Sequence, residues 1–240
     1  MRFDPPDAYW KKDVALFFSR RFALVLKLLY PMAIIVPVAA SGMPAQYAAA
    51  VIGIVAVMAG TFGAGESLTI DLNDGILVRV ALTPLSPYRI IFEVLAVNAI
   101  LDLVQLLPAL LIVYLLHPVP LIWMLAATLA VFATLVTANC IGIFIANFTS
   151  SPADVLLYAT AILFPLIYLS GFFRNQHPTG ILQMLRGFVP FSYTDDAMKT
   201  VFGLTTGTTP LEILVYPTII CAVLAFAVCL TAPRLLSQRP

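Results

Sequence analysis

The chain has 240 residues, of which 61% are hydrophobic and 10% are charged, and its mean hydropathy is +0.99. A soluble domain carries about 25% charged residues, so this composition indicates an integral membrane protein. The net charge of +1 supplies no basic excess for a phosphate-binding face, which argues against a nucleic-acid partner.

The N-terminal segment, residues 1–21, is predicted to contain an amphipathic helix on the cytoplasmic side. Trp10, Val14, Phe17 and Phe18 share one face at helical spacing, while the basic residues lie mostly on the other face. Such a helix lies in the membrane interface, with its aromatic rings in the headgroup layer and its cations toward anionic lipid. The same pattern fits a contact with a cytoplasmic partner, and the sequence leaves both roles open.

Residues 22–233 are predicted to form one all-α transmembrane domain, because an apolar helix of about 20 residues crosses the hydrocarbon core. Six segments are long and apolar enough for this. They run from Phe22 to Ala40, Ala45 to Gly65, Ile90 to Leu116, Leu121 to Ala146, Asp154 to Phe173 and Leu211 to Pro233. Residues 234–240 remain as a short tail.

The distribution of Lys and Arg predicts the orientation, since basic loops stay on the cytoplasmic side. With the N-terminus inside, the outer segments hold only Arg174, Arg186 and Lys199. The inner segments hold Arg2, Lys11, Lys12, Arg20, Arg21, Arg79, Arg89, Arg234 and Arg239. Both termini are therefore expected in the cytoplasm.

The glycines of "GTFGAGES", Gly60 to Ser67, have the spacing of a phosphate-binding loop. Glu66 stands where that loop requires Lys, so an anion replaces the cation that would contact phosphate. The segment also ends an apolar span and follows no strand, so we interpret its glycines as sites of close helix packing. We expect no catalytic, cofactor or metal site in this chain.

The polar link between the second and third spans, residues 66–89, is predicted to contain a short helix on the cytoplasmic face. Asn73 or Asp74 can cap its start, and an apolar side follows. Pro84 ends it, because the residue before proline is pushed out of the helical region. The sequence thus predicts a rigid helix over about residues 74–82.

The third span is predicted to start at Ser86 and Pro87, a suitable pair for the cap and first turn of a helix. Within the span, Asn98, Asp102 and Gln105 form a polar stripe on one face. An Asp at mid-bilayer costs about 2.5 to 3.5 kcal/mol on insertion scales, so the stripe should face other helices or a wet cavity. It can pack helices, line a transport path, or couple transport to protons through Asp102.

The outer segment between the fifth and sixth spans, residues 174–210, is long and amphipathic. Its two parts, "TGILQMLRGFVPF" and "SYTDDAMKTVFG", each carry apolar residues at near-helical spacing and each end at Gly or Pro. We predict two short helices at or dipping into the membrane interface. A solvated loop is the alternative.

The link after the second span resembles a motif of the ABC exporter permease family, the ABC type-2 permeases that export drugs, polysaccharides, lipids or haem. The family stretch reads roughly E-x-G-T-L-E-R-L-L-V-T-P-V-S, and this chain has "DGILVRVALTPLS". The matching positions are Gly75, Leu77, Arg79, Thr83, Pro84 and Ser86, with Asp74 close to the acidic position. Val78 replaces the usual acidic residue.

A second block supports the same resemblance. "LFPLIYLSGFF", Leu163 to Phe173, resembles the family run F-P-L-x-F-L-S-G-x-F, and "LRGFVPFSYTDDAMK" resembles L-x-x-x-N-P-L-T-Y-x-x-D-A-x-R. Val189 replaces the Asn of that pattern, and Lys199 replaces its final Arg. The two blocks lie in order within six spans, so the resemblance covers nearly the whole chain.

The resemblance implies a permease subunit of an ATP-driven exporter, in a bacterial or archaeal cytoplasmic membrane, that pairs with a second copy as a homodimer and carries an amphiphilic substrate. Two copies of a separate ABC ATPase subunit would bind ATP and Mg, so this chain itself would not be an enzyme. The implied coupling residues are Asp74, Gly75, Leu77, Arg79, Thr83 and Pro84. The alternatives are an ion-coupled carrier that uses Asp102 and a membrane-embedded enzyme.

Overall fold

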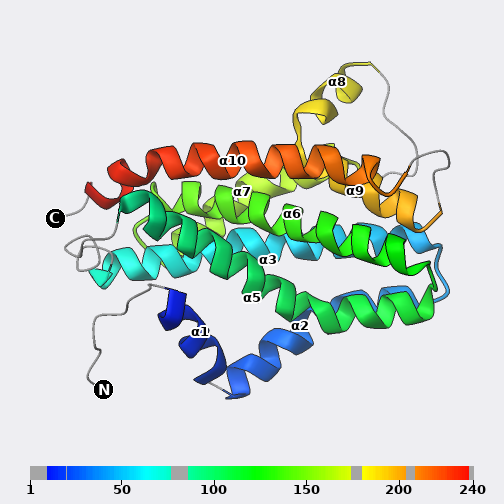
Figure 1. Cartoon of the computed structure of the whole chain (residues 1–240), viewed down its shortest axis with the longest axis horizontal. Helices are drawn as coiled ribbons and strands as arrows, with labels where there is room; N and C mark the ends of the chain where they lie inside the picture. Colours follow the sequence, from blue (N-terminus) through cyan, green and yellow to red (C-terminus); the bar gives the residue numbers. More distant parts are fainter. Residues whose placement is uncertain (1–9, 20, 77–85, 174–179, 204–208, 238–240) are drawn as a thin grey trace.

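The computed structural model describes residues 10–19, 21–76, 86–173, 180–203 and 209–237, and in these ranges it is built of helices and their links, without strands. The helices are α1 (Trp10–Ser19), α2 (Arg21–Ala40), α3 (Ala45–Asn73), α5 (Pro87–Leu116), α6 (Leu121–Ala146), α7 (Pro152–Ser170), α8 (Ile181–Phe188), α9 (Pro190–Val201) and α10 (Glu212–Ser237). Figure 1 shows the long helices lying side by side as one bundle.

Five helices, α3, α5, α6, α7 and α10, are long and apolar enough to cross a membrane, and α1 with α2 makes a sixth if this bent pair is counted as one span. The all-α membrane domain is confirmed, and these five helices correspond to the second to sixth predicted spans. The predicted first span, Phe22 to Ala40, does not qualify alone and is counted only together with α1, which was predicted to be a separate interfacial helix. α6 has the predicted bounds, and α5 starts at the predicted cap, where the Ser86 hydroxyl accepts a hydrogen bond from the backbone N–H of Arg89 at 3.3 Å.

α3 is longer than the predicted second span. Its 29 residues reach Asn73, eight positions beyond the expected end at Gly65, and at 1.5 Å per residue they span about 43 Å, more than the hydrocarbon core of about 30 Å. Asp74 lies at the C-terminal cap of α3. The helix that Asn73 or Asp74 was predicted to cap lies mostly outside the described residues, so that role stays a prediction. A helix satisfies its own backbone hydrogen bonds, so charged residues at its end need not stop it where the apolar run stops.

The core lies between α3 and α6, the two most enclosed helices. In their most apolar windows 67% and 78% of the residues are buried, against 17% in α10. Glycine allows this close approach: a Cβ added at Gly142 of α6 would lie 2.3 Å from the carbonyl oxygen of Thr61, and one at Gly60 of α3 would lie 2.8 Å from the Cβ of Ala138. The packing role predicted for Gly60 is confirmed.

The two ends of the bundle are built differently (Figure 1). At one end, which we call the inner end, α3 stops, α5 starts, and the short α6–α7 link lies near the last turns of α10. Beside it, α1 and the start of α2 stand away from the bundle and meet at a bend of 81°. The later part of α2 packs in the core through Ile35 and Ala39. At the opposite or outer end, α9 lies along the bundle and α8 stands out from its side. The orientation relative to the membrane stays a prediction.

Candidate functional site

The inner end of α3 is joined to α1 by an ion pair. Lys12 of α1 donates to both carboxylate oxygens of Asp71 in the last turn of α3, and the Lys12 ammonium lies 3.4 Å from Asp13. Asp71 and Asp13 are buried, and Lys12 is mostly buried. The ion pair between Lys12 and Asp71 connects residues 59 positions apart. Asp71 lies three residues before position 74, where the predicted coupling helix begins.

The inner end of α3 is also joined to the α6–α7 link. Asn73 donates from its side-chain amide to the carbonyl oxygen of Ser150 at 2.8 Å, and the hydroxyls of Thr69 and Thr149 lie 3.3 Å apart. Ser151 and Asp154 make a capping box that fixes the start of α7, in which each side chain accepts from the backbone N–H of the other. The link is therefore held by hydrogen bonds on both sides.

The predicted coupling residues lie only partly within the described chain. Asp74 ends α3, and Gly75 follows with a φ of +66°, a conformation that favours glycine and turns the chain after the helix. Leu77, Arg79, Thr83 and Pro84 fall outside the described residues, as does most of the predicted helix over residues 74–82. Their coupling role stays a prediction.

The predicted interfacial face of α1 does not present all of its residues alike. Trp10 and Phe18 are exposed, Val14 is partly buried, and Phe17 is buried with the Lys27 ammonium of α2 5.3 Å from its ring centroid. α1 thus contacts the protein on one side and leaves aromatic rings on its surface. Anchoring of these rings in lipid stays a prediction.

The polar stripe of α5 meets a residue that sequence reasoning missed. Asp102 is buried, while Asn98 and Gln105 are partly buried, and Asn98 donates back to the carbonyl oxygen of Val94 in its own helix at 2.9 Å. Asn139 of α6 is fully buried, and with its amide nitrogen turned toward α5 it donates to Asp102 Oδ2 at 3.3 Å. The sequence did carry a signal for Asn139, because a polar side chain inside the apolar fourth span is costly, as Asp102 is in the third span.

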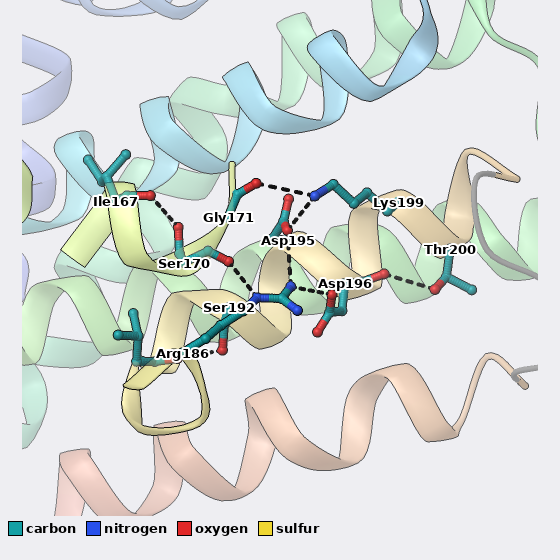
Figure 2. Close-up of polar contacts among 10 residues, drawn as sticks. Ile167, Ser170, Gly171, Arg186, Ser192, Asp195, Asp196, Lys199 and Thr200 are labelled. Carbon is teal, nitrogen blue, oxygen red and sulfur yellow. Dashed lines mark hydrogen bonds and ion pairs between the residues drawn. The ribbon is translucent and has the colours of Figure 1, made fainter. Parts of the chain in front are cut away.

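At the outer end, two of the sequence blocks quoted above meet in one cluster of charges (Figure 2). We call Arg186, Asp195, Asp196 and Lys199 the outer charge cluster. Arg186 of α8 pairs with Asp195 at 3.2 Å and also with Asp196, and Lys199 pairs with Asp195 at 2.6 Å. Lys199, which stands where the family pattern has Arg, thus keeps the cation at this position.

The outer charge cluster holds the C-terminal end of α7. Arg186 Nε donates to the carbonyl oxygen of Ser170 at 3.0 Å, and Lys199 Nζ donates to that of Gly171 at 3.3 Å. Gly171 has a φ of +100°, and a Cβ there would lie 3.1 Å from Asp195 Oδ2. Two cations placed at the negative end of a helix dipole are favourable, so α8 and α9 together cap α7.

Asp195 is the most enclosed charge of this cluster, with 1% of its side chain exposed. Burial raises the pKa of its carboxyl above the ordinary value, while the hydrogen bond and charge of Lys199 act in the opposite direction. Its Oδ1 has no hydrogen-bond partner among the described groups. The cluster therefore depends on its cations to keep a buried carboxylate in place.

In the described ranges, no group of three or more His, Cys, Asp or Glu side chains is arranged to hold a metal ion. The ion pairs at the two ends of the bundle, Lys12–Asp71 and Arg186–Asp195, were not predicted from the sequence. Each residue of Lys12–Asp71 and Arg186–Asp195 belongs to a segment discussed from the sequence, but the pairing depends on how the segments pack.

A protein-family model described as ABC-2 type transporter matches residues 8–203. No curated protein and no solved structure matches the chain. The family match extends from just before α1 to the turn that follows α9, and so includes both ends of the bundle.

Proposed function

This chain belongs to the ABC-2 type transporter family, and we propose that it is the membrane-spanning permease subunit of an ATP-driven exporter. Members of this family are membrane subunits of transporters, and they work with an ABC ATPase. In our proposal two ATPase subunits bind ATP and Mg, two copies of this chain form the transport path as a homodimer in the cytoplasmic membrane, and the segment from Asp74 to Pro84 receives the motion of the ATPase.

The observation that carries the coupling proposal is the way the inner end of α3 is fixed. The helix runs without a break from the core, through the Gly60 contact with α6, to Asn73 beside the proposed coupling segment. Lys12 and Ser150 hold that end from two sides. A force applied just after Asn73 therefore acts on a helix that is joined to α1, α6 and α7, rather than on a loose loop.

An amphiphilic substrate, such as a drug, a lipid or a lipid-linked glycan, fits the outward surfaces of the bundle. The large exposed side chains of α7 and α10 are almost all apolar, among them Leu157, Phe164, Val223 and Phe226. A substrate that moves along such a surface needs an apolar part, because a fully polar solute gains no contact that offsets the loss of water.

The experiment is reconstitution of this chain with its ATPase partner in lipid, followed by ATP hydrolysis and transport assays with candidate amphiphiles. Leu77→Asp and Arg79→Glu should each abolish substrate-stimulated hydrolysis while the chain still inserts in the membrane. Normal substrate-stimulated hydrolysis in both variants would refute the coupling assignment.

A second experiment tests the role of the inner end of α3. Lys12→Glu adds a third carboxylate beside Asp13 and Asp71 and should weaken coupling. Lys11→Glu changes an exposed neighbour in the same helix and should leave coupling nearly unchanged. The double variant Lys12→Glu with Asp71→Lys restores opposite charges and should recover part of the loss. Equal effects of both single variants would show that only the surface charge of α1 matters.

A further inference from the structure

Asp102 lies in an enclosed position in the middle of the bundle. Its side chain is on α5, with 8% of the residue exposed, and it faces α3 at Gly63. A Cβ built at Gly63 would lie 3.4 Å from Asp102 Oδ1, so the carboxyl group packs directly on the backbone of α3. A Cβ at Gly63 would therefore be in ordinary van der Waals contact with this oxygen.

One amide joins three helices at this point. With its nitrogen turned toward Asp102, the side chain of Asn139 donates to Asp102 Oδ2 at 3.3 Å and also to the carbonyl oxygen of Gly60. Its oxygen accepts from the backbone N–H of Ala99 at 3.0 Å. The Asp102–Asn139 pair therefore connects α3, α5 and α6 through hydrogen bonds inside the membrane domain.

The groups around Asp102 do not neutralise a negative charge. α3 presents Gly60 and Gly63, and α6 presents the uncharged Asn139. The Lys27 ammonium of α2 acts on Asp102 electrostatically, but among the described residues no ion pair includes Asp102. An ionised carboxylate buried without a paired cation is strongly disfavoured, and such a group takes up a proton instead.

We propose that Asp102 binds one proton and is a neutral carboxylic acid in the resting transporter. The hydrogen bonds of Asp102 and Asn139 then hold α3, α5 and α6 together as a helix lock. The ligand of this site is a proton, and its role is to hold the helices in one arrangement. The inference goes beyond the export function and does not depend on it, since it concerns the resting state of the chain itself.

Infrared spectroscopy of the purified full-length chain in lipid at neutral pH tests the proposal. The difference spectrum between the native chain and Asp102→Asn should show loss of a carbonyl stretching band typical of a protonated carboxylic acid. Glu66→Gln changes an exposed carboxylate at the inner part of α3 and should remove only carboxylate bands. If Asp102→Asn also removes only carboxylate bands, Asp102 is ionised and the proposal is overturned.

Asn139→Leu provides a test that does not depend on the stability of the Asp102 variant. It leaves the acid without its donor, so the protonated band should shift in frequency and the unfolding midpoint should fall by about 4–8 °C. Asp102→Asn keeps the shape of a neutral acid and should lower the midpoint by less. A larger fall for Asp102→Asn than for Asn139→Leu, or an unshifted band in Asn139→Leu, would contradict the lock.

Discussion

Arg186→Ala should destabilise the protein much more than loss of an ordinary surface ion pair. The guanidinium is 11% exposed, pairs with Asp195 and Asp196, and donates to the carbonyl oxygen of Ser170. Removing one partner of a buried pair costs about 3–5 kcal/mol, because the remaining charge stays buried. Lys199 still pairs with Asp195 after the substitution, which places the expected loss nearer the lower figure.

The matched control is Arg89→Ala, which removes an ion pair of α5 whose arginine is 56% exposed. Exposed pairs contribute about 0.2–1 kcal/mol. For a chain of this size, 3–5 kcal/mol corresponds to a fall in unfolding midpoint of roughly 6–20 °C, measured by circular dichroism of the chain in lipid nanodiscs. Equal falls in unfolding midpoint for Arg186→Ala and Arg89→Ala would refute the inference that the buried ion pairs of Arg186 stabilise the protein more than an exposed pair does.

Two glycine substitutions test close contacts, each against a glycine with open space beside it. Gly171→Ala and Gly203→Ala share the cost of a positive φ, about 1–2 kcal/mol. Only Gly171→Ala brings a Cβ against the outer charge cluster, so the unfolding midpoint of that variant should fall further. Equal falls would mean that backbone strain alone acts. Gly142→Ala drives a Cβ into the carbonyl oxygen of Thr61 and should lower the free energy of unfolding by about 3 kcal/mol or more. The Cβ of Gly187→Ala in α8 meets nothing within 4 Å, so this change should leave the stability unchanged or slightly raised. A Gly142→Ala chain of unchanged stability would contradict the α3–α6 contact.

The spans could be predicted well because hydropathy and length are strong constraints in a membrane. α6 was predicted to the residue, since Pro120 and the Asn147 to Ser150 link bound it clearly. The end of α3 was predicted too early, because Glu66 and Asp71 suggested a polar loop. The structure shows a helix whose inner turns leave Glu66 exposed and pair Asp71 with Lys12.

The candidate sites were harder to predict, because they depend on packing between distant segments. Asp102 could be singled out by its cost in a span, but the sequence left three roles open for it. Its burial against Gly63 and Asn139 supports a packing role. Nothing in the sequence places Arg186 beside the end of α7, since α8 also fits a helix free at the membrane surface.

The close contacts between α3 and α7 connect the two ends of the bundle. Near the inner end, a Cβ at Gly65 would lie 2.8 Å from Val155 of α7, and near the outer end, one at Gly53 would lie 2.2 Å from Phe172, in the turn that follows α7. These contacts are twelve residues apart on α3, about 18 Å along its axis. Because closely packed interiors transmit strain, we expect a displacement of the inner end of α3 to move α7 with it. The same displacement would then reach α8 and α9, which the outer charge cluster joins to the last carbonyl groups of α7.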